Sequence, residues 1–200
     1  QYKKVVFLDP KNLDAYFNMG EIHEIFKRYE EAIQNFQSAI DIDPNHVEGH
    51  VRLGWNYAKL QHSEEALAEF QAALEIDPDR EQTYYRLGVI YGELERFSEG
   101  LESLQKSLRL NPNHLDTLFQ LGRFNSILGN YQKSTNHLNK LLKLAPNYSE
   151  VGLLLGKNLV ELNQFENALP HLEKAIQQQP DSFESQFYLG LRSEEHTSEL

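Results

Sequence analysis

The feature that most constrains the fold is a proline that returns at one fixed interval. Six of the seven prolines lie 34 residues apart, at Pro10, Pro44, Pro78, Pro112, Pro146 and Pro180. Glycine keeps the same interval at Gly20, Gly54, Gly88, Gly122, Gly156 and Gly190. A constant period of this length predicts stacked copies of one small unit, each of which cannot bury its apolar face alone.

Two amphipathic helices fit between successive prolines. The first complete copy has one apolar stripe at helical spacing, followed by a second: Tyr16, Met19, Gly20, His23 and Phe26, then Ala32, Ile33, Phe36, Ala39 and Ile40. The proline ends the second helix, because it lacks an N–H and disfavours the helical conformation of the residue before it. The pattern therefore predicts two helices of about 14 residues in each copy.

The repeated glycine needs a packing reason, because glycine inside a helix costs about 1 kcal/mol relative to alanine. We expect the second helix of each copy to approach the first closely at this glycine. A small residue of the second helix would face it in every complete copy: Ala32, Ala66, Gly100, Ser134 and Ala168.

These markers resemble the tetratricopeptide repeat, most completely in the segment "LGWNYAKLQHSEEALAEFQAALEIDP". The resemblance implies an all-α fold, a right-handed α-α superhelix (solenoid) of antiparallel helix pairs with a 34-residue period. The large aromatic residue that the family has early in the first helix is present at two positions and replaced at three: Tyr16 and Tyr84, then His50, Leu118 and Gly152.

The repeats predict one array over residues 1–191. It consists of a partial repeat at 1–12, full repeats at 13–46, 47–80, 81–114, 115–148 and 149–182, and a partial repeat at 183–191. From Arg192 the pattern stops, and "RSEEHTSEL" resembles the translated read-through of a widely used sequencing adapter, so we expect 192–200 to be non-native. The chain would then be a fragment whose cut ends expose apolar groups and favour self-association, namely Val5, Val6, Leu8, Phe187 and Leu189.

Composition disfavours several classes of function. A net charge of −11 without any basic run argues against a nucleic-acid partner, which requires clustered Lys and Arg. The absence of cysteine excludes thiolate metal sites, disulfides and a cysteine nucleophile. The longest apolar runs are too short to span a bilayer.

No catalytic pattern emerges from the sequence. The repeated glycines lie inside helices and not in phosphate-binding loops, and the Glu-rich segments favour solvated helix faces. His46 and His50 are four residues apart, but we expect His46 to lie in a turn outside the helix. His137 and His171 occupy equivalent places in successive copies, which favours an exposed helix face. We therefore expect no metal, no cofactor and no enzyme activity within these residues.

The resemblance implies that the first helix of each pair lines a concave groove. On that face, aromatic and cationic residues lie side by side against the acidic background. The candidate peptide-binding groove comprises Phe17, Asn18, Arg52, Trp55, Tyr85, Arg86, Phe119, Arg123 and Lys157. Apolar side chains of a ligand would meet the aromatics, and its carboxylates would meet the arginines. The alternative is that the aromatics pack between neighbouring helices and the cations pair with nearby Glu.

The sequence thus predicts a non-catalytic interaction scaffold that binds a peptide or protein segment in its concave groove. Two alternatives stay open: the docking or regulatory arm of a larger enzyme, such as a glycosyltransferase or kinase, and a structural or assembly role through the convex face and the ends. Two specialised subtypes are not supported. Only Arg86 fits the clamp for acidic chaperone tails, and only Asn18 fits the asparagine ladder of O-linked N-acetylglucosaminyltransferases.

Overall fold

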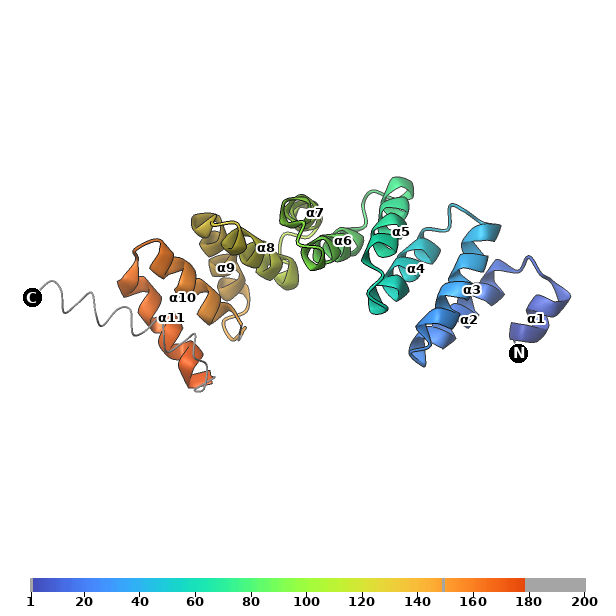
Figure 1. Ribbon diagram of the computed structural model, residues 1–200, viewed down its shortest axis with the longest axis horizontal. Coiled ribbons are helices and arrows are strands. Elements are labelled where there is room, and N and C mark those ends of the chain that lie inside the picture. The colour runs from blue at the N-terminus through green and yellow to red at the C-terminus, as the bar shows by residue number, and fades with distance from the viewer. Residues whose placement is uncertain (1, 149, 179–200) are drawn as a thin grey trace, which may run out of the picture. The chain divides into compact units, whose positions relative to one another are not determined.

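The computed structural model describes residues 2–148 and 150–178, and all regular structure in this part of the chain is α-helical (Figure 1). The chain divides into two compact units, of which unit 1 ends at Leu110 and unit 2 begins at Asn111. The predicted all-α fold class is confirmed.

Consecutive helices form antiparallel pairs within each unit. Unit 1 contains α1 (Tyr2–Leu8), then α2 (Leu13–Ile25) with α3 (Tyr29–Ile42), α4 (Val47–Lys59) with α5 (Ser63–Ile76), and α6 (Glu81–Glu93) with α7 (Phe97–Leu110). Unit 2 contains α8 (Leu115–Ile127) with α9 (Tyr131–Leu144), and α10 (Val151–Glu161) with α11 (Phe165–Gln178). The second helix of one pair packs on the first helix of the next within a unit, as in a solenoid.

The helix ends follow the proline signal, and the turn inside each pair has one recurring conformation. The second helices end two residues before an in-phase proline, at Ile42, Ile76, Leu110 and Leu144. Between the two helices of a pair, one residue has a positive φ: Lys27 (56°), Gln61 (62°), Glu95 (57°), Gly129 (72°) and Asn163 (57°). The sequence marked these turns but not their left-handed residue, because Gly129 alone among the five is a glycine.

The close approach predicted at the in-phase glycines is present at the five that the structure describes, and a large side chain causes it. A Cβ atom added to Gly122 would lie 2.5 Å from a methyl carbon of Leu138, and one added to Gly20 would lie 2.6 Å from the Phe36 ring. The equivalent partners of Gly54, Gly88 and Gly156 are Phe70, Leu104 and Leu172. Each partner is fully or almost fully buried and lies four residues after the small residue that the sequence pointed to.

The core of unit 2 also contains a chain of buried hydrogen bonds. Ser126 Oγ on α8 donates to Asn158 Oδ1 on α10 at 2.6 Å, and Asn158 Nδ2 donates to Ser134 Oγ on α9 at 2.7 Å. Ser134 Oγ in turn donates to the Gly122 carbonyl at 2.6 Å. Because the three side chains satisfy one another, this polar chain fixes the relative positions of three helices.

The expectation that His137 and His171 lie on an exposed helix face is wrong. Both side chains are half-buried. Burial lowers the pKa of both imidazoles, and Lys140 and Lys174 respectively lower it further.

At the N-terminal end, Val5 and Leu8 are exposed as predicted, but Val6 is half-buried, because α1 packs against α2. Phe7 was not predicted to be exposed, yet 84% of it is accessible to solvent. Phe187 and Leu189, and with them the segments 183–191 and 192–200, lie outside the described residues.

The close contact between Gly122 and Leu138 can be tested with a double-mutant cycle. We expect Gly122→Ala to lower the free energy of unfolding by about 1–3 kcal/mol, because the new methyl group overlaps the buried Leu138 side chain. Leu138→Ala alone should cost about 2–5 kcal/mol. The double variant should be more stable than the sum of the two losses by at least ~0.5 kcal/mol in urea unfolding, and strict additivity would contradict this packing.

Stability should also depend on pH through His137 and His171. Their pKa values are lowered in the folded state, so the unfolded chain binds more protons below about pH 6.5 and stability falls as the pH drops through that value. We expect the urea midpoint to decrease between about pH 7.5 and pH 5.5. The double variant His137→Gln/His171→Gln should show a smaller decrease than the parent chain. An equal pH dependence in the double variant would exclude this assignment.

Candidate functional site

Trp55 on α4 lies close to two cations. The Lys59 Nζ, one helical turn later, is 4.1 Å from the centroid of the indole ring. The Arg86 Cζ on α6 is 4.5 Å from the same centroid. Cations at these distances over an aromatic face are attracted by its quadrupole. We refer to Trp55, Lys59 and Arg86 as the Trp55 cluster, which joins α4 and α6 on the face that the sequence assigned to ligand binding.

Arg52, the neighbour of the cluster, has its donors engaged by the chain itself. Its guanidinium is 3.4 Å from Glu21, 3.2 Å from Glu24 and 3.0 Å from Glu48. Burial acts to lower the pKa of Arg52, but Glu24, Glu48 and Glu21 outweigh burial and raise it. Glu24 also accepts a hydrogen bond from the Asn56 amide at 3.1 Å.

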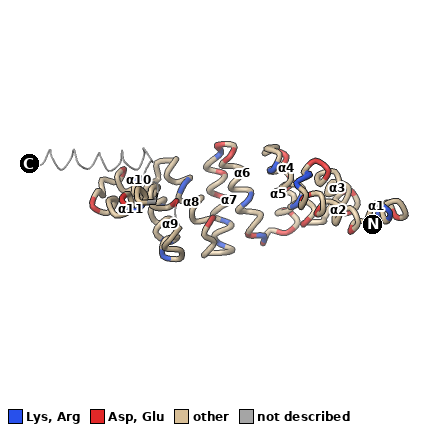
Figure 2. The backbone as a smooth tube through the Cα atoms, turned by 90° about the horizontal axis from the view of Figure 1, so that it is seen from below, with Lys and Arg blue, Asp and Glu red and all other residues tan. Residues whose placement is uncertain are grey.

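Arg86 has the opposite environment. Within residues 2–148 and 150–178, no carboxylate lies close enough to Arg86 for an ion pair, and Glu48 pairs instead with Arg80 at 2.6 Å. Burial lowers the pKa of the Arg86 guanidinium, and the charge of Arg52 lowers it further. The group stays protonated at neutral pH, so Arg86 is a half-buried cation without a direct counter-charge. Figure 2 shows basic and acidic positions next to one another around α4 and α5.

The other predicted groove residues of unit 1 make contacts with residues of the chain itself. The Phe17 ring packs edge-on against Phe36 and His46, with centroids 5.4 and 5.0 Å apart. The Asn18 amide donates to the Asp14 carbonyl at 2.6 Å. Tyr85 is half-buried and already has a partner in the chain. Phe17 and Arg52 therefore show the internal packing and pairing that the alternative interpretation described.

The remaining predicted residues belong to unit 2. The Phe119 ring lies 5.5 Å from the ring of Tyr148, whose hydroxyl donates to Asp116 at 3.0 Å. Arg123 is exposed, with its Cζ 5.4 Å from the Phe124 ring centroid. Lys157 is half-buried and has a partner in the chain.

Sequence reasoning missed the part of the site that depends on distant pairs. The Glu48–Arg52 pair and the Trp55–Lys59 contact follow from positions four residues apart on one helix, and this signal was available. The Arg80–Glu48 and Asn56–Glu24 contacts each join residues 32 positions apart, so only the packing of neighbouring pairs reveals them.

The two histidines at metal-ligand spacing have structural contacts. His46 is the N-cap of α4, and its Nδ1 accepts from the Gly49 N–H at 3.1 Å. His50 Nδ1 is 2.7 Å from Glu69, and its Nε2 is 3.0 Å from the Pro44 carbonyl oxygen. The described residues contain no group of three potential metal ligands, and none of their helices is long and apolar enough to span a bilayer.

Comparison with known structures supports the fold. The chain is similar to MamA (TM-score 0.79, 20% identity, covering 82% of this chain and 90% of that chain). It is also similar to YrrB, described as a TPR protein with an unusual peptide-binding site (TM-score 0.83, 22% identity, 100% and 98% coverage). A third similar structure is pilF of Pseudomonas aeruginosa (TM-score 0.78, 17% identity, 94% and 86% coverage). At these identities the likeness concerns the fold alone.

Family models provide the sequence-based assignment. No curated protein matches the sequence significantly. Three models described as tetratricopeptide repeat do match, over residues 26–91 with 127–190, over 81–114 and over 1–47. Together they span well over half of the chain. The chain therefore belongs to the tetratricopeptide-repeat family, whose members are typically non-catalytic scaffolds for protein interactions.

Proposed function

We propose that the chain is a non-catalytic scaffold that binds a peptide or protein segment in the groove lined by its first helices. In unit 1 the central contact is the Trp55 cluster. The ligand segment carries a carboxylate for Arg86 and an adjacent apolar side chain for Trp55.

The observation that carries this proposal is the difference between Arg52 and Arg86. The two arginines occupy the same position in successive repeats, but three glutamates surround Arg52 and no carboxylate pairs with Arg86. A carboxylate from a partner would supply the missing counter-charge through the two-pronged geometry that guanidinium favours. Its binding would be strengthened by the half-buried position of Arg86, where water screens the charge less.

Trp55 supports the apolar part of the same contact. It is half-buried, and tryptophan and arginine are the residues most often found as anchors of protein interfaces. Phe17, Asn18, Arg52 and Tyr85 would contribute shape and orientation around this anchor, because their own contacts already hold them in place. In unit 2, Phe119, Arg123 and Lys157 are proposed as contacts of the same kind and can be tested separately.

Selection of peptides can test this proposal without knowledge of the partner. A displayed library of 12-residue peptides is selected on the chain, and individual winners are synthesised and titrated. We expect winners to carry Asp or Glu next to an apolar residue. Trp55 is the chain's single tryptophan, so a change in its fluorescence during titration reports contact at the cluster directly.

Variants then identify the carboxylate contact. Arg86→Gln should weaken the winners roughly 10- to 100-fold, since a charge-assisted bond contributes about 1.5–3 kcal/mol. Arg28→Gln is the matched control, because Arg28 is exposed and makes no ion pair in the described part of the chain. Trp55→Ala should also weaken binding when measured by calorimetry. Winners without acidic residues, or winners that bind Arg86→Gln and Trp55→Ala as tightly as the parent chain, would refute the proposal.

A further inference from the structure

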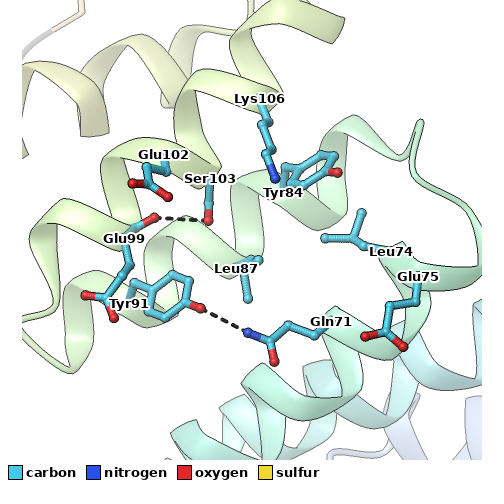
Figure 3. A pocket seen from close by; sticks show the side chains of 10 residues that line it. All are labelled: Gln71, Leu74, Glu75, Tyr84, Leu87, Tyr91, Glu99, Glu102, Ser103 and Lys106. Atoms are coloured by element: carbon cyan, nitrogen blue, oxygen red, sulfur yellow. Dashed lines mark hydrogen bonds between the residues drawn. The ribbon is translucent and has the colours of Figure 1, made fainter.

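A pocket of about 370 Å³ opens between α5 and α7 and is closed by α6 (Figure 3). Its α6 lining consists of Tyr84, Leu87 and Tyr91, which share one helix face. Tyr85 and Arg86 point from the opposite face of the same helix. The pocket therefore belongs to unit 1 but not to the Trp55 cluster.

The polar lining of this pocket is acidic, and only some of its side chains make hydrogen bonds or ion pairs. Gln71 donates to the Tyr91 hydroxyl at 3.0 Å, and Glu99 pairs with Arg96 at 2.7 Å. Glu75 on α5 and Glu102 on α7 have no hydrogen bond or ion pair with any described residue. Three carboxylates and one ammonium group thus line the pocket, since Lys106 is its single cationic residue.

The edge of the pocket already holds one guanidinium. Arg96 lies with its Cζ 4.8 Å from the Tyr91 ring centroid. The same side chain donates to Glu99 through its Nε at 2.9 Å and its Nη2 at 2.7 Å. A tyrosine ring and a carboxylate of this lining therefore bind an arginine of the chain itself, by a cation–π contact and two hydrogen bonds to one carboxylate oxygen.

At the equivalent place one repeat earlier, the chain supplies an imidazole ring of its own. There, between α3 and α5, His50 stands at the position of Tyr84, and its Nδ1 lies 2.7 Å from Glu69. Glu69 corresponds to Ser103 of the later crevice. An imidazole of the chain thus contacts a carboxylate at the earlier place, whereas Glu75 and Glu102 form no ion pair with a basic group of the described residues.

In unit 2 the equivalent crevice has different chemistry. It measures about 280 Å³ and has Gly152 at the position of Tyr84 and Pro170 at the position of Glu102. Lys174, the counterpart of Lys106, donates to the Pro146 carbonyl at 3.1 Å. Lys106 lies instead 5.3 Å from the Tyr84 ring centroid. Of these three places, the one between α5 and α7 combines aromatic rings with unpaired carboxylates.

We propose that this pocket binds an arginine side chain of a partner protein. The planar guanidinium would lie over the half-buried Tyr84 ring and donate to Glu102 and Glu75, much as Arg96 contacts Tyr91 and Glu99 at the edge. A pocket of this volume lies within the range of small-ligand sites. Lys106 competes with the incoming cation for the same carboxylates and the Tyr84 ring.

The test uses the 200-residue chain and two matched probes. N-acetyl-arginine N-methylamide is titrated while backbone amide signals are followed by NMR, and N-acetyl-citrulline N-methylamide supplies the same shape without the charge. We expect saturable shifts in α5, α6 and α7 for the arginine probe, weakened by added salt, and none for the citrulline probe. The lysine analogue should bind more weakly, because ammonium cannot form the planar stack.

Variants separate this pocket from the groove. Glu102→Gln should raise the Kd of the arginine probe about threefold or more, and Lys106→Met should lower it. Glu31→Gln, an exposed change on α3, should leave it unchanged. Arg86→Gln should weaken the selected groove peptides but not the arginine probe, so either proposal can fail alone. Equal binding of the citrulline probe, shifts confined to other helices, or an unaltered Kd in both Glu102→Gln and Lys106→Met would overturn the proposal.

Discussion

The arrangement of each helix pair depends on one contact, in which a large buried side chain of the second helix lies against a glycine of the first. Leu138 at Gly122 and Phe36 at Gly20 illustrate it, since no Cβ atom fits between them. The contact fixes both the separation and the rotation of the two helices. Because the glycine returns at one phase, the opposite face of every first helix is presented in the same way. The positions of Arg52 and Arg86 on adjacent helices follow from this repetition.

Identical placement does not produce identical chemistry. Arg52 forms ion pairs with glutamates from α2 and α4, whereas Arg86 lies over Trp55 and feels Glu48 and Glu24 only from a distance, without an ion pair to either. The crevices between second helices differ in the same manner: Tyr84 and Glu102 of one correspond to Gly152 and Pro170 of the other. The regular backbone thus repeats the same helix face and the same kind of crevice, and a few side chains decide whether a charged group in a given copy has an ion-pair partner.

Much of the fold could be predicted from the sequence, because its determinants are local and recur. The prolines marked the ends of the second helices, and the glycines marked the close contact within each pair. The left-handed residue at Lys27 or Glu95 could not be predicted, since neither residue type favours that conformation. The half-burial of His137 and His171 was missed because it depends on neighbouring helices and not on helix periodicity.

For the candidate site, the sequence brought Trp55 and Arg86 to one face but could not show which cations are already paired. That distinction rests on contacts such as Arg80 with Glu48, which join successive repeats. The pocket between α5 and α7 was beyond sequence reasoning for a similar reason. Its lining comes from three helices, and its character depends on where Lys106 points.

The turn inside each helix pair places residues of different types in one left-handed conformation. Four of the five carry a side chain in a conformation that glycine would adopt with less strain, so the reversal of the chain is imposed by the packed helices on either side. The residue type therefore differs from corner to corner, while the backbone conformation is the same in all five. A substitution at such a corner can therefore leave the spacing of the two helices unchanged.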